Sequence, residues 1–300
     1  MVHRSMPVPA VMEPAMKIGQ LYHEAGQRLA AGGIAEPELE AALLLGHVLR
    51  CSRAQIFLNT GQDVSARQAD SLAALIARRL RREPAAYILG EQEFWSLSFC
   101  VSPDVLIPRP ESEDLLEKAF ALIRERGLPQ GPLLDLGVGS GALTVVLARE
   151  LPDRFVVGVD RSWDALRVAA ENIRRHGVRD RCFLLNSDWL GCVKTKKTFA
   201  LVVSNPPYIA STSMETLQPE VKNFEPHLAL TAGSDALAAV RVLARQVHEV
   251  MQPGGHFFME IGWDQGDAVL EIFSAIPAYE NLRVHADLAG HPRILEARCF

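Results

Sequence analysis

The turn at Asn205, Pro206, Pro207 and Tyr208 combines residue types that could act on a planar nitrogen. It follows "LVVS", an apolar run that predicts a buried strand. A proline after Asn205 favours an extended asparagine, and the proline ring removes a backbone donor. The turn thus offers two acceptors to an NH2 group, the Asn205 side-chain oxygen and the Pro206 carbonyl oxygen. Tyr208 can pack against the plane of such a substrate.

The chemistry that this turn suggests is methylation of an amide or exocyclic amine. The nitrogen lone pair of these groups is delocalised, so the nitrogen is a poor nucleophile. Two acceptors would fix the NH2 group and stabilise the positive charge that develops on nitrogen, while alignment with a sulfonium methyl supplies the orientation. We therefore expect Asn205, Pro206 and Tyr208 to be catalytic, and the whole turn from Asn205 to Tyr208 to contact the substrate.

A glycine-rich turn upstream is a candidate nucleoside site. In "LLDLGVGSGALTVVLA", Gly137, Val138, Gly139, Ser140 and Gly141 lie between a predicted strand and a predicted helix. Glycines let the backbone approach a ligand closely, and a helix N-terminus favours polar or negative groups. The alternative is a tight turn with no ligand.

Acidic and aromatic residues end the next two predicted strands. Asp160 lies 19 residues after Gly141 and can accept both hydroxyls of a ribose. Asp188 and Trp189 could place a carboxylate and an aromatic ring beside an adenine, although the tryptophan could equally fill the core. We expect Asn205 to contact the cofactor as well. The loop fits S-adenosylmethionine, and it leaves a dinucleotide open because Ala142 loosely occupies the third glycine position of that fingerprint.

These candidate residues require a sheet that brings strand ends together. From Leu133 onward, short apolar runs ending in polar residues or glycine are mostly separated by helical patterns. This alternation predicts an α/β fold with a mostly parallel sheet covered on both faces. The tail "NLRVHADLAGHPRILEARCF" predicts a terminal hairpin that gives the sheet an antiparallel edge.

The remaining chain predicts a second, helical part. Residues 16–88 have helical spacing, with a capping-box pattern at Ser65 and Gln68, and we expect no strand there. Residues 1–15 predict a flexible tail, residues 89–130 a hairpin and a linker helix, and residues 131–300 the catalytic domain. The helical part could bind a protein substrate or simply cover the edge of the sheet.

Composition narrows the function classes. The chain has 300 residues and a formal net charge of −5, which disfavours non-specific binding to nucleic acid. Its five cysteines are scattered without a CxxC, so we expect neither a metal site nor a disulfide framework. No apolar run is long enough for a membrane span, and we expect a cytoplasmic protein.

Several blocks together resemble the PrmC/HemK family of protein-glutamine N5-methyltransferases, which modify peptide-chain release factors. The blocks are "VLIPRPESE", "DLGVGSGAL", "SNPPYI", "FEPHLALTAGSDAL" and "DLAGHPRILEAR", and the resemblance covers nearly the whole chain after the tail. It implies a Rossmann-like class I methyltransferase domain that uses S-adenosylmethionine. The implied substrate is the glutamine in the Gly-Gly-Gln loop of class I release factors.

The resemblance also implies roles for individual residues. It assigns the cofactor loop to Gly137 through Gly141, the ribose contact to Asp160, the adenine side to Trp189 and the glutamine contacts to Asn205 through Tyr208. The chain departs from the family at Val138, where threonine is usual, and at Trp95-Ser96, where Tyr-Gly is usual.

Two smaller features and two rival functions stay open at this point. Arg109 could pair with Glu111 or Glu113, or reach the cofactor carboxylate. The segment "EPHLAL" from Glu225 is expected to close a lid loop near the turn. The first rival function is a DNA adenine-N6 methyltransferase, which would need a basic groove and a domain to recognise its target. The second is a silent binding protein that retains the fold.

Overall fold

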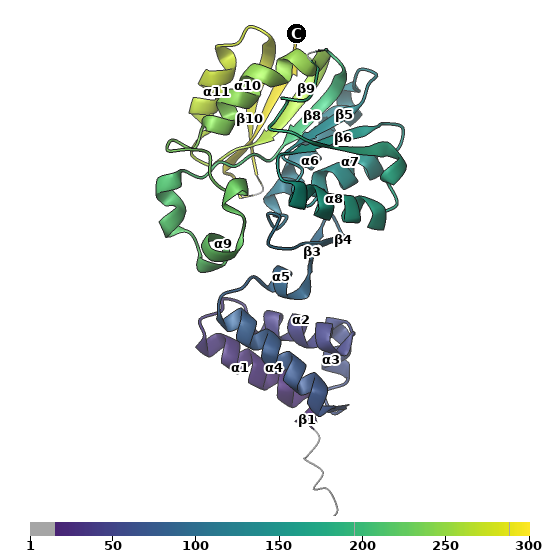
Figure 1. The fold of residues 1–300 in the computed structure, drawn as a ribbon, viewed down its shortest axis with the longest axis vertical. Coiled ribbons are helices and arrows are strands. Elements are labelled where there is room, and N and C mark those ends of the chain that lie inside the picture. Colours follow the sequence, from purple (N-terminus) through teal and green to yellow (C-terminus); the bar gives the residue numbers. More distant parts are fainter. Residues whose placement is uncertain (1–15, 195, 288) are drawn as a thin grey trace, which may run out of the picture. The chain divides into compact units, whose positions relative to one another are not determined.

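The computed structural model describes residues 16–194, 196–287 and 289–300, so the predicted tail at 1–15 lies outside the described residues. The chain divides into two compact units between Leu89 and Gly90 (Figure 1). The hairpin and the helix predicted for residues 89–130 belong to the second unit.

The first unit is helical. Its helices are α1 (Ile18–Ala31), α2 (Pro37–Leu49), α3 (Arg53–Leu58), α4 (Ala66–Leu80) and α5 (Ala85–Leu89). The capping box at Ser65 and Gln68 is present, because each residue's side chain accepts a hydrogen bond from the other's backbone N–H. The expectation of no strand was wrong, since β1 (Met16–Lys17) pairs with β2 (Asp63–Val64). That pairing joins segments far apart in the chain, and two residues are too few to show an alternating pattern.

The second unit contains the predicted mixed sheet. Its seven strands are β5 (Leu133–Leu136), β6 (Val156–Asp160), β7 (Cys182–Asn186), β8 (Phe199–Ser204), β9 (Met251–Glu260), β10 (Tyr279–Ala286) and β11 (Pro292–Cys299). They lie in the order β10-β11-β9-β8-β5-β6-β7. The neighbours from β9 to β7 are parallel, whereas β11 is antiparallel to both β9 and β10. The predicted fold class and its antiparallel edge hairpin are therefore confirmed.

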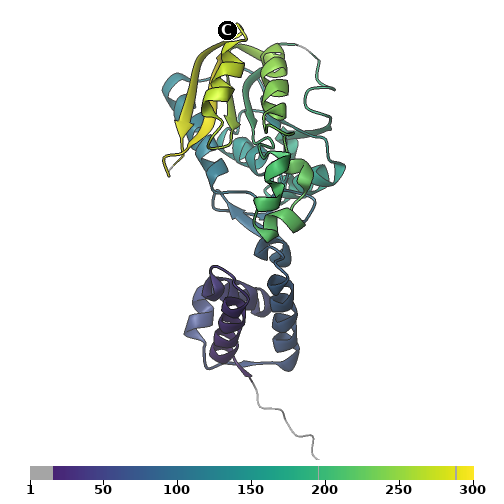
Figure 2. The same cartoon turned by 90° about the vertical axis from the view of Figure 1, so that its left-hand side faces the viewer.

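Helices cover both faces of this sheet (Figures 1 and 2). The helices of the second unit are α6 (Glu111–Arg126), α7 (Ala142–Glu150), α8 (Trp163–Arg175), α9 (Pro219–Phe224), α10 (Ala238–Val250) and α11 (Gly266–Ser274). In β8, Leu201 and Val203 share a core with α6, α7 and α8, whereas Val202 shares a core with α10 and α11. Side chains alternate between faces along a strand, so an uninterrupted apolar run fills both cores.

A hairpin precedes the sheet in this unit. Strands β3 (Glu91–Phe94) and β4 (Leu97–Cys100) are joined by Trp95 and Ser96, whose φ angles are 54° and 55°. Two positive φ angles match the twist of a two-residue hairpin turn, a conformation that glycine adopts more easily than tryptophan or serine.

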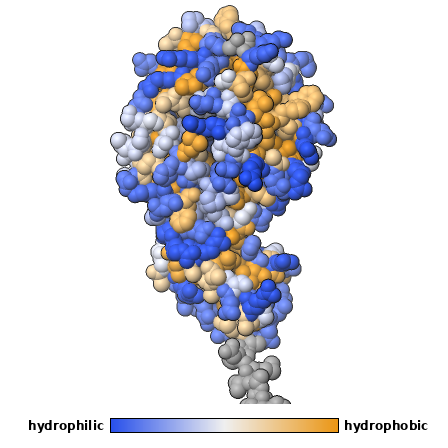
Figure 3. Space-filling view, viewed as in Figure 1, coloured by the Kyte–Doolittle hydropathy of each residue, from blue (hydrophilic) through white to orange (hydrophobic). Residues whose placement is uncertain are grey.

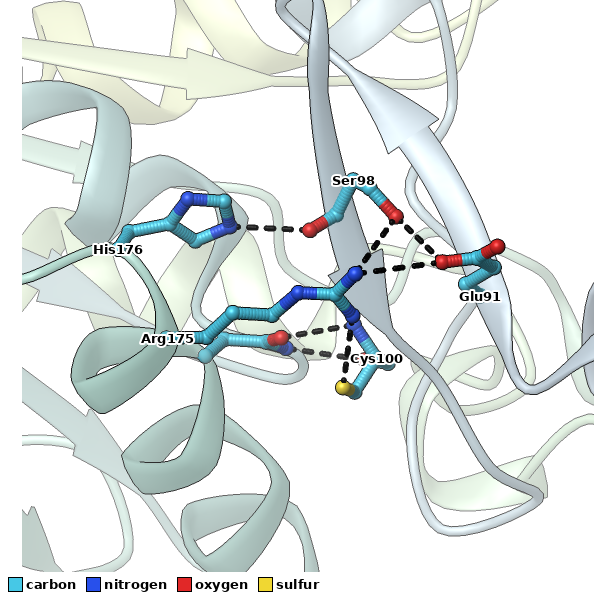
Figure 4. A network of polar contacts seen from close by, with 6 residues as sticks. Glu91, Ser98, Cys100, Arg175 and His176 are labelled. Carbon is cyan, nitrogen blue, oxygen red and sulfur yellow. Dashed lines mark hydrogen bonds and ion pairs between the residues drawn. The ribbon is translucent and has the colours of Figure 1, made fainter.

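The hairpin is attached to α8 by polar contacts (Figure 4). Arg175 reaches Glu91, Ser98 and the Cys100 thiol, and the ring of His176 bonds to the Ser98 carbonyl. Asn172 of α8 is fully buried, and its side chain bonds to both the N–H and the C=O of Cys100.

The space-filling view shows apolar residues interspersed with hydrophilic ones (Figure 3). The large apolar side chains exposed on the second unit are Phe155, Trp163, Phe183, Leu185, Leu228, Trp263 and Phe300. Among the described residues, none of the helices has both the length and the apolar character that crossing a bilayer demands.

Candidate active site

The predicted site residues gather at the carboxyl ends of the parallel strands in the second unit. The chain leaves β5 toward β6 on one side, and β8 returns on the other side of β5. Open α/β sheets bind ligands at such a reversal. A cavity of about 560 Å³ lies here, within the usual size range of small-molecule sites.

The glycine loop forms one wall of this cavity. Gly137, Val138, Gly139 and Ser140 line it, whereas Gly141 does not. The φ angle of Gly141 is 83°, and a Cβ atom there would lie 3.1 Å from the Cα of Ala169 in α8. Glycine is thus required at position 141 because the loop packs closely on α8 there. The four residues before it form the wall of the cavity.

Asp160 ends β6 and lines the cavity beside the loop. Its Oδ2 accepts a hydrogen bond from the Gly139 N–H at 2.9 Å, and its Oδ1 accepts one from the Ser162 N–H at 2.9 Å. These bonds fix the carboxylate, and each oxygen keeps a further lone pair for a ligand hydroxyl. This pair of acceptors fits the ribose hydroxyls of a nucleoside cofactor.

Asp188 and Trp189 follow β7 and also line the cavity. Trp189 has a φ angle of 50°, a left-handed conformation that is uncommon for a bulky residue. Part of its side chain packs against the apolar core that includes α10, so the core role is present, while a contact with an adenine stays a prediction. Its place among the lining residues fits an aromatic wall for an adenine.

Only two of the four residues of the Asn-Pro-Pro-Tyr turn line the cavity. Asn205 and Pro207 line it, whereas Pro206 and Tyr208 are not among the lining residues. The Pro206 side chain is buried. The Tyr208 hydroxyl donates to Glu260 Oε1 at 3.0 Å, and burial raises the pKa of this phenol, as does the neighbouring Glu260 charge. Stacking of Tyr208 on a substrate therefore stays a prediction.

A polar network connects Asn205 with Ser112, which also lines the cavity, and with the buried Glu260. The Asn205 Nδ2 donates to Ser112 Oγ at 2.9 Å, and Ser112 Oγ donates to Glu260 Oε2 at 2.6 Å. Glu260 is 1% exposed at the carboxyl end of β9. Burial raises the pKa of the Glu260 carboxyl, while the hydrogen bonds from Ser112 and Tyr208 lower it; the net direction is upward.

Comparison with known proteins identifies the family. Residues 20–90 match the PrmC N-terminal domain, and residues 114–223 match the methyltransferase small domain. A release factor glutamine methyltransferase of Caulobacter vibrioides is 40% identical over 90% of this chain and 92% of its own length. Proteins of the same name from Koribacter versatilis and Vibrio cholerae are 38% and 40% identical, over 94% and 90% of this chain and 99% and 92% of theirs. The chain belongs to the release factor glutamine methyltransferase family.

Solved structures support the fold of this family member. The hMettl16 catalytic domain in complex with the MAT2A 3'UTR hairpin 1 aligns with a TM-score of 0.55 at 15% identity, covering 81% of this chain and 84% of that one. At this identity the likeness shows a shared Rossmann-like methyltransferase fold. It confirms the predicted fold class, and the family membership confirms that the protein is a methyltransferase.

In this methyltransferase, Arg109 has a partner that sequence reasoning missed. It forms an ion pair with Glu225, whose Oε2 also accepts a hydrogen bond from the Ile107 N–H at 3.3 Å. Glu225 is 3% exposed, and Arg109 lines the cavity. The pairings suggested for Arg109 with Glu111 or Glu113 were wrong, and Glu113 instead accepts a hydrogen bond from the Trp95 N–H at 2.7 Å.

The segment that carries Glu225 forms another wall of the cavity. It contains α9 and the lining residues Pro226, Leu228, Ala229, Thr231, Ala232 and Gly233. The backbone N–H of Ile209 donates to the Leu230 carbonyl at 2.9 Å, which ties this wall to the turn. The expected position of "EPHLAL" near the turn agrees with this contact, whereas its closure as a lid loop stays a prediction.

Asp135 is a further carboxyl close to the site. It lies fully buried in β5, and its Oδ2 accepts a hydrogen bond from Thr144 Oγ1 at 2.6 Å. Its Oδ1 has no hydrogen-bond partner among the described residues. Burial raises the pKa of Asp135 to about 7, and the nearby charge of Asp160 contributes in the same direction.

Proposed function

We propose that the protein transfers a methyl group from S-adenosylmethionine to the side-chain amide nitrogen of a glutamine. The proposed substrate is the Gly-Gly-Gln loop of class I peptide-chain release factors. The proposal is supported by family membership, by a cavity that suits a nucleoside cofactor, and by the acceptor turn at its wall. The observation that carries it is the position of Asn205 at that wall, with its Nδ2 already engaged and its Oδ1 left for the substrate.

The residues that line the cavity are proposed to bind different parts of the cofactor. Gly137, Gly139 and Ser140 would lie against the cofactor, Asp160 would accept its ribose hydroxyls, and Trp189 would flank its adenine. When bound, S-adenosylmethionine supplies an activated methyl group on a positively charged sulfur.

The turn then acts on the glutamine. Asn205 Oδ1 and the Pro206 carbonyl would each accept one proton of the glutamine NH2 group, which fixes the plane of the amide. Both oxygens carry partial negative charge, so they would stabilise the nitrogen as it becomes positive during methyl transfer. No strong base is needed before attack, because the proton can leave to water or to an acceptor once the N–C bond has formed.

The first unit is proposed to recognise the protein substrate. A Gly-Gly-Gln loop is a small target on a large protein, so a second contact would add affinity and select the correct protein. The match of residues 20–90 to a domain named for this family supports the proposal. The expected place of the reaction is the cytoplasm.

The decisive experiment is mass spectrometry of a purified release factor after incubation with the enzyme and S-adenosylmethionine. We expect one added methyl group, located on the glutamine of the Gly-Gly-Gln peptide. Asn205→Ala should lower kcat by about 100-fold or more, as removal of one stabilising contact does in other enzymes, with cofactor affinity nearly unchanged. A release factor whose loop glutamine is replaced by alanine is the negative control, and methylation at any other residue would overturn the proposal.

A further inference from the structure

We propose that Ser112 and Glu260 are positioning residues that hold the Asn205 amide with its oxygen toward the substrate. The inference rests on the proposed function of Asn205 as an acceptor. An asparagine amide can adopt two orientations, because rotation by 180° about its last bond exchanges the acceptor oxygen for the donor NH2 group.

The direction of each hydrogen bond follows from the carboxylate at the end of the network. In its ionised form the Glu260 carboxyl only accepts, and Ser112 then donates its single hydroxyl proton to Glu260 across 2.6 Å. Ser112 Oγ can then only accept from Asn205, which must turn its NH2 group toward the serine at 2.9 Å. The Asn205 oxygen is left on the other side, where it has no partner in the part of the chain that the structure describes.

The reversed orientation would defeat the reaction. It would present the Asn205 NH2 group to the NH2 group of the substrate, so that two donors would oppose each other. A donor would also repel the positive charge that develops on the attacking nitrogen. The network therefore decides whether this residue assists or opposes methyl transfer.

Two features make the network rigid. Glu260 receives a second donor, the Tyr208 hydroxyl, at 3.0 Å, so each of its two oxygens is held by a hydroxyl from a different element. Glu260 and Ser112 are only 1% and 5% exposed, so water does not compete freely for their hydrogen bonds. Ser112 belongs to the first turn of α6, Asn205 follows β8, and Glu260 ends β9, so three elements meet at one polar cluster.

The main test compares two variants of equal shape, Ser112→Val and Ser112→Thr. Threonine keeps the hydroxyl and valine lacks it, so any effect of bulk is shared. We expect kcat of Ser112→Val for release-factor methylation to fall by about tenfold or more below that of Ser112→Thr. Ser112 lines the cavity, but the two variants change its wall by the same bulk, and the hydroxyl is bonded to Asn205 and Glu260. The Kd for S-adenosylmethionine should therefore agree within about twofold between them.

Ser112→Ala adds no bulk, so it can be tested even if the Ser112→Val and Ser112→Thr variants do not fold. Its matched control is Ser204→Ala, because Ser204 precedes Asn205, is fully buried, and donates instead to the Leu136 carbonyl at 2.7 Å. A loss of kcat in Ser112→Ala but not in Ser204→Ala supports the proposal. Equal kcat in the two alanine variants, together with equal kcat in the valine and threonine variants, refutes it.

A spectroscopic readout separates this proposal from the proposed function. In protein labelled with ¹⁵N-asparagine, the Asn205 side-chain signal is the one that Asn205→Ala removes. Its amide protons should exchange slowly with water in the wild type and in Ser112→Thr, and quickly in Ser112→Val. If the wild-type enzyme failed to methylate the release-factor glutamine, the proposed function would fail, while these exchange rates would still decide how the amide is held.

Discussion

Replacement of Asp135 by asparagine should change how the stability of the second unit depends on pH. The carboxyl is fully buried, and its pKa is raised from 3.8 to about 7. Between pH 3.8 and about pH 7, the Asp135 carboxyl holds a proton in the folded protein and has lost it in the unfolded chain. Stability contributed by this proton is present at low pH and is lost as pH rises through 7. Asparagine keeps the shape and cannot titrate, so this component disappears from Asp135→Asn.

The size of the effect follows from the pKa values. From pH 5 to pH 7 the folded state holds most of one extra proton, and each pH unit with one proton is worth about 1.4 kcal/mol. The free energy of unfolding of the wild type should therefore fall by about 2 kcal/mol relative to Asp135→Asn over this interval. Other titrating groups, such as His256, act in both proteins and cancel in the difference.

The assay can isolate the second unit. All four tryptophans lie in it, at positions 95, 163, 189 and 263, so urea unfolding followed by tryptophan fluorescence reports on this unit alone. Unfolding is measured at several pH values between 5 and 8 for both proteins. A difference that stays flat or grows with pH would mean that Asp135 is ionised in the folded protein, and the reasoning from burial would be refuted.

Three further substitutions test other parts of the site. Arg109→Ala leaves the Glu225 carboxylate buried without its ion-pair partner, so the second unit should lose about 3 kcal/mol in urea unfolding. Gly141→Ala adds a Cβ at 3.1 Å from the Ala169 Cα at a φ of 83°, and should cost about 2 kcal/mol or more in the same assay. Asp160→Asn would direct an NH2 group at the backbone N–H of either Gly139 or Ser162, which both donate to Asp160. It also removes one acceptor for the ribose hydroxyls. Calorimetry should show S-adenosylmethionine binding weakened by about tenfold or more.

Each of these substitutions has a matched control. Arg241 pairs with Asp235 on the surface, so Arg241→Ala should change stability little. Gly177 has a φ of 69° and open space at its Cβ, so Gly177→Ala measures backbone strain without the clash. Asp164 is exposed on α8, and Asp164→Asn should leave cofactor affinity unchanged. Equal effects in a variant and its control would contradict the assigned cause.

Much of the site could be predicted because its residues follow strands. Asp160, Trp189 and Asn205 each come just after an apolar run, and parallel strands bring those positions to one edge. Glu260 carried the same signal at the end of "FFME" and could have been found by the same reasoning. Ser112 gave no signal of its own beyond its place in "RPESE", because its role depends on two residues from other elements.

The amino-acid sequence by itself determined the elements and the chemistry at their ends. Apolar runs produced β5 through β9, Ser65 and Gln68 capped α4, and the proline after Asn205 shaped the turn, because these effects act between near neighbours in the chain. Tertiary structure alone decided which way the Asn205 amide points and which carboxylate Arg109 meets. Those bonds join residues 93, 148 and 116 positions apart, so they exist only after the sheet and its helices have packed.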